Sequence, residues 1–193
     1  MPMEKYDPSQ LRDVSVPLEQ IATRGLLLSV VLLLLGALPH ILIWGFDSTF
    51  HGADYLLGFI ATIILLVLHE ATHALGWIIF AGVSPASIRF GIMWKTLSPY
   101  AHSRVAMPAG GYRIGVILPA ILTGILPALI GTITNTGWLT AAGAVLLSGA
   151  VGDLIVLQII RAIPANAQVL DHPTNAGCYV VVESESSSPD HQF

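Results

Sequence analysis

Two histidines and a glutamate interrupt an otherwise apolar run, LLVLHEATHALGWIIF, at residues 65–80. His69 and His73 are four residues apart, so on an α-helix they lie about 40° apart around the axis and point the same way, as two ligands of one zinc ion must. Glu70, one position on, is placed to reach a metal-bound water rather than the metal. The spacing therefore indicates hydrolytic zinc chemistry, in which the glutamate takes a proton from the attacking water and delivers it to the leaving amine.

The apolar surroundings of this HExxH motif favour a bound metal. Each uncompensated charge in the middle of a bilayer costs about 2.5–3.5 kcal/mol on insertion scales, so three ionisable groups within five residues need a compensating partner. A bound cation supplies one, and zinc is the default metal for imidazole and carboxylate ligands. The alternative is a pair of histidines packed in a core without any ligand, which would compete more strongly in a soluble helix.

A catalytic zinc ion needs a third protein ligand, and the candidates within the apolar segments are His40 and Asp153. His69 lies 15 residues into its segment and Asp153 lies 16 residues into its own, so both are about 23 Å along helices that run the same way. Small residues near both positions permit close approach of the two helices. Asp153 is therefore predicted as the third ligand, the alternative being an aspartate that serves helix packing alone. His40 is too close to the outer surface to share the site and is predicted to be an interfacial histidine.

Four apolar segments must position these residues, and each is long enough to cross a hydrocarbon core of about 30 Å. They cover residues 25–45, 54–82, 114–134 and 137–163. Of the 193 residues, 54% are hydrophobic and only 10% are charged, which disfavours the alternative of four buried helices in a large soluble protein. The sequence thus predicts an all-α membrane protein with four transmembrane helices.

Charge and cysteine content exclude two further classes. The net charge of −4 comes without a basic stripe, so no nucleic-acid partner is expected. Cys178 is the only cysteine, which excludes an intramolecular disulfide and a cysteine-based metal cluster.

The basic residues predict the orientation of the chain in the membrane. Seven of the eight precede the first span or lie between the second and third, and Arg161 ends the fourth. By the positive-inside rule both termini and the 83–113 loop are expected in the cytoplasm of a multi-pass protein of the plasma membrane. Residues 1–24 are then a cytoplasmic N-terminal segment, residues 25–163 a four-helix metalloprotease-like domain, and residues 164–193 a cytoplasmic tail that is disordered after about residue 184.

Short β-favouring runs lie in the 83–113 loop, ASIRFGIMW and HSRVAMPAGGYRIG, separated by the turn-like LSPYA. They predict a short cytoplasmic β-hairpin-like insertion between the second and third helices, or a sheet partly inserted in the membrane. The tail stretch NAQVLDHPTNAGCYVVVE is expected to end in a strand. Arg113, at the start of the third span, is expected to snorkel to the interface.

HEATH on a transmembrane helix, a β-like loop after it and an aspartate in a later span resemble the core of the site-2 protease type of intramembrane zinc metalloproteases. The closer resemblance is to a small family of bacterial and archaeal integral membrane proteins described as putative zincin peptidases. In that family a GD in the last span and a DHP…G stretch after it accompany the HExxH motif, here Gly152-Asp153 and DHPTNAG.

The resemblance covers roughly residues 54–183 and implies that His69, His73 and Asp153 are zinc ligands and that Glu70 is the catalytic base. The chain departs from site-2 proteases in one respect. They usually carry the aspartate in an Asp-Gly motif preceded by an Asn-x-x-Pro segment, whereas here leucine follows the aspartate and no such segment precedes it.

The leading functional hypothesis is a zinc-dependent peptidase that hydrolyses peptide bonds within or beside the membrane by a metal-activated water. Its partners would be a membrane protein or peptide substrate and the lipid bilayer, with the 83–113 loop holding the substrate extended by strand addition. The alternative is a non-hydrolytic membrane metal-binding protein, a transporter or sensor. A third hypothesis is a protein without catalytic activity that binds zinc for stability. A di-iron enzyme is disfavoured, because it would need a second Glu-x-x-His motif that the sequence lacks. The sequence predicts neither a particular substrate nor an oligomeric state.

Two further histidines fall outside the spans. His102 and His172 are predicted to be surface or loop histidines rather than metal ligands, because loops carry polar residues routinely. Of the residues outside the motif, the stretch Asp171-His172-Pro173 is the better candidate for lining the site.

Overall fold

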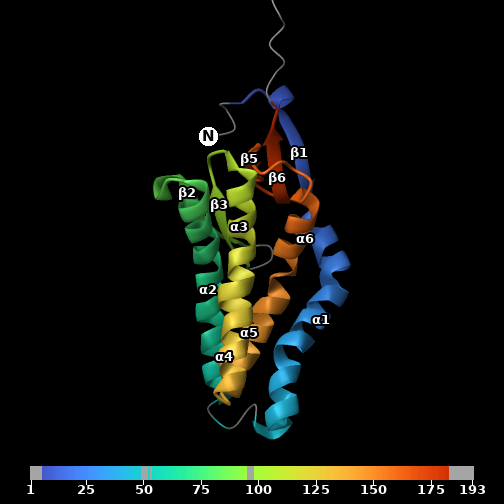
Figure 1. Cartoon of the computed structure of the whole chain (residues 1–193), viewed down its shortest axis with the longest axis vertical. Coiled ribbons are helices and arrows are strands. Elements are labelled where there is room, and N and C mark those ends of the chain that lie inside the picture. The colour runs from blue at the N-terminus through green and yellow to red at the C-terminus, as the bar shows by residue number, and fades with distance from the viewer. Residues whose placement is uncertain (1–5, 49–51, 53, 95–97, 183–193) are drawn as a thin grey trace, which may run out of the picture.

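Four helical rods run along the long axis of the protein in the computed structural model, which describes residues 6–48, 52, 54–94 and 98–182 (Figure 1). Each rod contains a helical segment long and apolar enough to cross a membrane, which confirms the prediction of four such segments. The first two rods are α1 (Leu18–Trp44) and α2 (Asp54–Ala81). The third consists of α3 (Ala109–Pro119), the π-helical turn η5 (Ala120–Ile125) and α4 (Leu126–Ile133), and the fourth of α5 (Gly137–Gly149) and α6 (Val151–Ile160).

The third rod begins earlier than the predicted residue 114. The first amide groups of a helix have no partner inside it, so an early start needs acceptors from elsewhere. Here the Ala109 N–H donates to the Ala167 carbonyl and the Gly110 N–H donates to the Ala165 carbonyl, each at 2.9 Å. The segment after α6 therefore allows α3 to begin before the apolar run does.

The fourth rod is interrupted, whereas the sequence predicts one unbroken span. At Ala150 the backbone turns to φ −70° and ψ 4°, and this residue separates α5 from α6. Asp153 consequently lies in the first turn of α6, at the helix end where the dipole favours a negative charge.

An antiparallel hairpin lies between the second and third rods. It pairs β2 (Ile88–Met93) with β3 (Ser98–Ser103), so that Phe90 faces Ala101. The prediction placed a turn at LSPYA, but Pro99 to Ala101 belong to β3. Pro99 is tolerated because its nitrogen lies on the edge of β3 that faces away from β2, where the ladder needs no N–H donor.

A four-stranded antiparallel sheet joins three separate parts of the chain, in the order β1-β6-β5-β4. The strands are β1 (Leu11–Val16), β4 (Met107–Pro108), β5 (Gln168–Asp171) and β6 (Ala176–Val181). The sequence predicted a strand near the end of the tail, and β4 lies within the β-favouring run HSRVAMPAGGYRIG, but neither was expected to join a sheet with residues near the N-terminus. The all-α description is thus too simple, because the protein is mostly helical with two small sheets at one end of the rods (Figure 1). The predicted disorder after about residue 184 falls outside the described residues.

The best-packed core lies where α2, α3 and α6 meet the four-stranded sheet. Met107, Ile160, Val169 and Cys178 are at most 1% exposed there. Along the outer faces of α1 and α2, by contrast, large apolar side chains such as Leu27 are exposed. Large exposed apolar helix faces, next to an end of the molecule that has a buried core, are typical of a membrane protein.

Candidate metal centre

A close crossing of α2 and α3 brings the third rod against the HExxH motif. A Cβ atom added to Gly76 would lie 2.6 Å from the Cα of Gly115, which is closer than packed atoms can approach. Glycine at both positions therefore lets the two backbones touch, as in small-residue crossings of membrane helices. As a result, a backbone carbonyl of α3 lies within reach of a histidine on α2.

His73 uses this carbonyl. Its Nδ1 atom lies 2.9 Å from the Gly115 oxygen, and because a carbonyl can only accept, the proton must be on Nδ1. The ring also stacks on Trp77 with centroids 5.8 Å apart, and Trp77 stacks in turn on Tyr112. The orientation and the tautomer of His73 are both fixed by α3 and by its own helix, which leaves the Nε2 lone pair free for another partner.

His69 is held in the same way by a hydroxyl group. Its Nδ1 lies 3.2 Å from Thr123 Oγ1, and that hydroxyl donates its own proton to the Pro119 carbonyl at 2.8 Å. The hydroxyl therefore accepts from Nδ1–H. Thr123 belongs to the π-helical turn η5, a rare conformation that is often found at functional sites.

Asp153 faces the two free nitrogens from α6. One carboxylate oxygen lies 3.1 Å from His69 Nε2 and the other lies 3.5 Å from His73 Nε2. The structure thus brings the predicted third ligand to both histidines, which are 7% and 8% exposed. With one proton on each ring, at Nδ1, two nitrogen lone pairs meet a carboxylate, and either a metal ion between them or a second proton on a ring relieves the repulsion. Two imidazole nitrogens and one carboxylate are a ligand set that fits zinc.

Glu70 is close to the histidines but is held elsewhere. Ligand atoms of His69, Glu70 and His73 all lie within 4.8 Å of one another, so the glutamate could also approach a shared ion. However, one of its carboxylate oxygens accepts a hydrogen bond from the Ala101 N–H of β3 at 2.7 Å. The side chains of Glu70 and Asp153 therefore have different contacts. Asp153 faces the Nε2 atoms, and Glu70 lies between the histidines and the edge of the hairpin.

His40 lies outside this cluster, as predicted, but its surroundings are not those of an interface. It is fully buried, and its Nδ1 lies 3.2 Å from Thr140 Oγ1 on α5. Arg113 does not extend freely to the interface either. It donates to the carbonyls of Ile160 and Ile163 and so caps the end of α6.

The second group of polar residues lies in the sheet region beside the metal centre. His102 Nδ1 lies 2.8 Å from one oxygen of Asp171, and Tyr112 donates its hydroxyl proton to the other oxygen at 2.9 Å. His102 is therefore bound to a carboxylate rather than free in a loop. The DHP stretch pointed to Asp171, but no local signal pointed to Tyr112, Thr123 or the Ala101 amide.

His172 is buried and holds a turn together. Its Nδ1 accepts hydrogen bonds from the amides of Thr174 and Asn175, at 3.1 and 2.8 Å, and its ring stacks on Tyr179. Burial lowers the pKa of His172, despite the nearby carboxylates of Asp13 and Asp171. These contacts give His172 a structural role in the sheet, not the lining role considered from the sequence.

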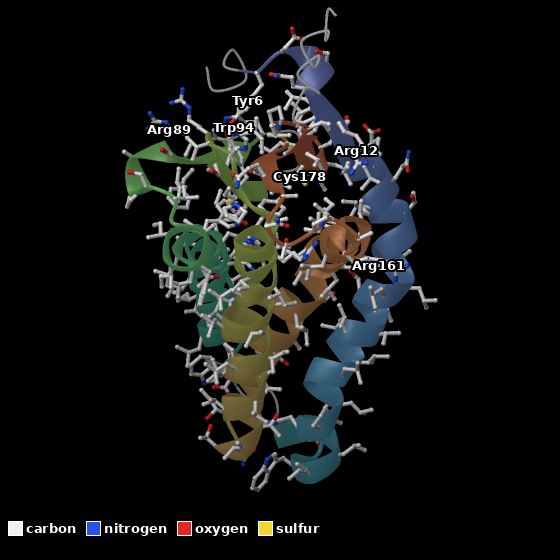
Figure 2. The ribbon with its side chains drawn as sticks, turned by 45° about the horizontal axis from the view of Figure 1, so that its top comes forward. Tyr6, Arg12, Arg89, Trp94, Arg161 and Cys178 are labelled. Carbon is white, nitrogen blue, oxygen red and sulfur yellow. The ribbon has the colours of Figure 1, made fainter. Side chains whose placement is uncertain are left out.

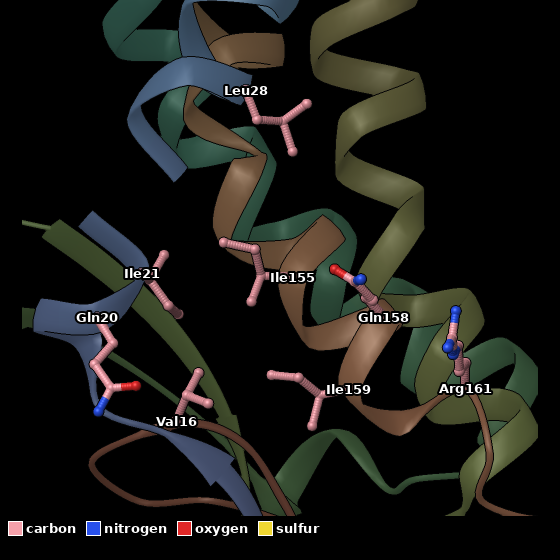
Figure 3. Close-up of a pocket in the computed structure, with 8 residues that line it drawn as sticks. All are labelled: Val16, Gln20, Ile21, Leu28, Ile155, Gln158, Ile159 and Arg161. Carbon is pink, nitrogen blue, oxygen red and sulfur yellow. The ribbon is translucent and has the colours of Figure 1, made fainter. Parts of the chain in front are cut away.

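A separate cavity of about 440 Å³ lies between α1 and α6 (Figure 3). On α6 it is lined by Ile155, Gln158 and Ile159, which at 100° per residue are about 140–240° around the helix from Asp153. The cavity is therefore on the opposite face of α6 from the metal centre.

The comparisons with known proteins concern mainly the region of this centre. A protein family described as "Putative zincin peptidase" matches residues 62–168 of the chain. This segment contains the HExxH motif, the hairpin, the third rod and Asp153. Neither the curated proteins nor the solved structures gave a match.

Proposed function

Because the chain belongs to the family described as "Putative zincin peptidase", we propose that it is a zinc-dependent peptidase that cuts peptide bonds within or beside the membrane. One observation carries the proposal. The two oxygens of Asp153 face the Nε2 atoms of both motif histidines, whose protons are held on Nδ1. A hydrolytic zinc site needs three such ligands and one open position.

In the proposed site His69, His73 and Asp153 hold the ion, which when bound would activate a water molecule and polarise the scissile carbonyl. Glu70 takes a proton from the water as its oxygen attacks the carbonyl carbon. It then delivers that proton to the amine nitrogen as the carbon–nitrogen bond breaks. The Ala101 N–H, which binds Glu70 at 2.7 Å, orients the base for both transfers.

The proposed access is from the end of the rods that carries the sheets. Arg12, Arg89 and Arg161 all lie at this end, and the positive-inside rule assigns such an end to the cytoplasm (Figure 2). His69 is 12 residues, or about 18 Å, from the end of α2 on this side and about 23 Å from its start. We therefore propose a plasma-membrane protein with cytoplasmic termini, a site that opens to the cytoplasmic half, and a membrane protein or peptide as substrate, as in site-2 proteases.

The decisive variant is Glu70→Gln, which keeps the shape of the side chain and an acceptor for Ala101 but removes the base. We expect it to abolish cleavage and to leave the zinc content at the wild-type level. Membranes from cells with wild-type protein or with the variant would be compared for new protein N-termini, and zinc would be measured on the purified proteins. Glu19→Gln, in the first turn of α1, is the matched control and should behave as wild type.

The outcomes separate the peptidase from its alternative. Cleavage that persists in the Glu70→Gln variant would contradict the proposed mechanism. Zinc bound by the wild-type protein without any difference in N-termini would instead support the transporter or sensor.

A further inference from the structure

Asp171, at the end of β5, accepts hydrogen bonds from two different elements. One oxygen lies 2.8 Å from His102 Nδ1 and 3.3 Å from the Ser103 amide nitrogen, both on β3. The other oxygen accepts the hydroxyl proton of Tyr112, on α3, at 2.9 Å. The side chain of Asp171 is only 12% exposed, so these contacts hold it well away from water. One carboxylate thus ties the hairpin to the third rod.

The contacts to β3 lead directly to the proposed base. The Ser103 and Ala101 amides lie on the same edge of β3, because alternate residues of a strand direct their N–H groups the same way. The first of these amides binds Asp171 and the second binds Glu70. Whatever fixes the position of this edge therefore fixes the donor that orients Glu70.

The contact to α3 leads to the proposed metal ligands. Tyr112 is 3% exposed, and its ring stacks on Trp77 with centroids 5.8 Å apart. Trp77 stacks in turn on the ring of His73. The carboxylate that binds the Tyr112 hydroxyl thus stabilises the aromatic stack behind a motif histidine.

We propose that Asp171 is a positioning residue for the metal centre. It clamps β3 against α3, so that the Ala101 N–H stays on Glu70 and the aromatic stack stays on His73. This inference rests on the proposed peptidase function for its effect on turnover, but the clamp itself can be tested without any substrate.

Asparagine at position 171 should preserve the clamp without its charge. The amide oxygen accepts from His102 and Ser103, while the amide NH₂ donates to the Tyr112 oxygen. Tyr112 then turns its own proton to the Gly177 carbonyl, which already lies 3.1 Å away. Alanine offers none of these contacts. Rescue by asparagine therefore distinguishes positioning from an effect of the negative charge.

The test compares Asp171→Ala, Asp171→Asn and wild type by hydrogen–deuterium exchange of residues 98–104, zinc content and cleavage rate. We expect alanine to speed exchange of the β3 amides and to lower cleavage about 100-fold, the effect of a displacement of about 1 Å, with zinc content unchanged at saturating metal. We expect asparagine to restore both. Asp13→Ala, which removes an exposed carboxylate of β1 on the far side of β6 from Asp171, is the control and should change neither.

Cys178, the only cysteine, reports whether the sheet itself is intact. Burial raises the pKa of its thiol to about 12, so a thiol reagent should label it only when the sheet opens. If Asp171→Ala exposes Cys178, the milder His102→Phe variant replaces it, and the same faster exchange in β3 is expected.

Unchanged β3 exchange in Asp171→Ala and in His102→Phe would overturn the clamp. So would an Asp171→Asn variant that is as defective as Asp171→Ala. A wild-type protein that cleaves nothing would instead contradict the proposed peptidase, while the exchange measurements still test the clamp.

Discussion

Two pairings of histidine with aspartate lie near one another in this protein, and they are built in opposite ways. In the metal centre, Asp153 faces the Nε2 atoms of His69 and His73. In the sheet region, Asp171 faces the Nδ1 atom of His102. The residue types are the same, but the ring atom that meets the carboxylate differs.

The difference lies in where the ring protons are. Around Asp171 every neighbour is a donor, namely a ring N–H, a backbone amide and a phenol, so the carboxylate is satisfied by protein hydrogens alone. Around Asp153 the ring protons are already donated to the Gly115 carbonyl and the Thr123 hydroxyl. One pairing is therefore complete as a hydrogen-bonded structure, whereas the other needs a metal ion or a second proton on a ring to balance the carboxylate.

The largest expected effect follows from exchanging one histidine of each pairing for alanine. His73→Ala should lower zinc affinity by more than the roughly 100-fold that loss of an outer partner can cost, because it removes a ligand. His102→Ala should leave zinc affinity well inside the roughly 10-fold that loss of an outer partner costs, because the ring bonds to Asp171 and, among the described residues, to no proposed ligand. Titration of the purified proteins with zinc measures both. A loss of zinc from the His102 variant would show that the two pairings are one site.

A smaller effect is expected from the groups that hold the ring protons. Thr123→Val keeps the shape of the side chain but removes the acceptor of His69 Nδ1–H, and we expect zinc affinity to fall about 10- to 100-fold. Thr132→Val is the matched control, because Thr132 is also buried and also bonds the carbonyl four residues before it, but on α4. Equal zinc affinity in the two valine variants would remove Thr123 from the site.

The residues of the proposed ligand set could largely be predicted from the sequence because their placement depends on local spacing and on depth. His69 and His73 follow from a four-residue interval on one helix, and comparison of depth along two spans selected Asp153. The proton acceptors could not be predicted in this way. Every residue has a carbonyl, so nothing in the sequence singles out Gly115, and the orientation of Thr123 depends on a π-helical turn that has no clear sequence signal.

The four-stranded sheet could not be predicted from the sequence for a different reason. β1 pairs with β6, so that Leu11 lies opposite Val181, although the two residues are near opposite ends of the sequence. The strand β6 was expected from the tail, but β1 by itself is a short, partly buried run that resembles a loop, and only its distant partner makes it a strand. Asp171 belongs to β5, which pairs with β4 so that Val169 faces Met107, and this second long-range pairing explains why the link between β3 and α3 became visible only in three dimensions.

The smallest expected effect concerns His172. Its Nδ1 accepts hydrogen bonds from two amides, unlike the Nδ1 atoms of the histidines beside Asp153 and Asp171, which donate. Burial lowers its pKa, so below about pH 6.5, its ordinary value, the unfolded chain binds a proton that the folded protein does not. Stability should therefore decrease as the pH falls below about 6.5 and be unaffected by this group above it. In His172→Asn the amide oxygen replaces Nδ1 as acceptor and cannot titrate, so the loss of Tm between pH 7.5 and pH 5.5 should be smaller than in wild type by on the order of a few degrees. An identical pH dependence in both proteins would show that the turn tolerates a protonated ring. In that case the position of the ring proton would distinguish only the histidines beside Asp153 from the histidine beside Asp171.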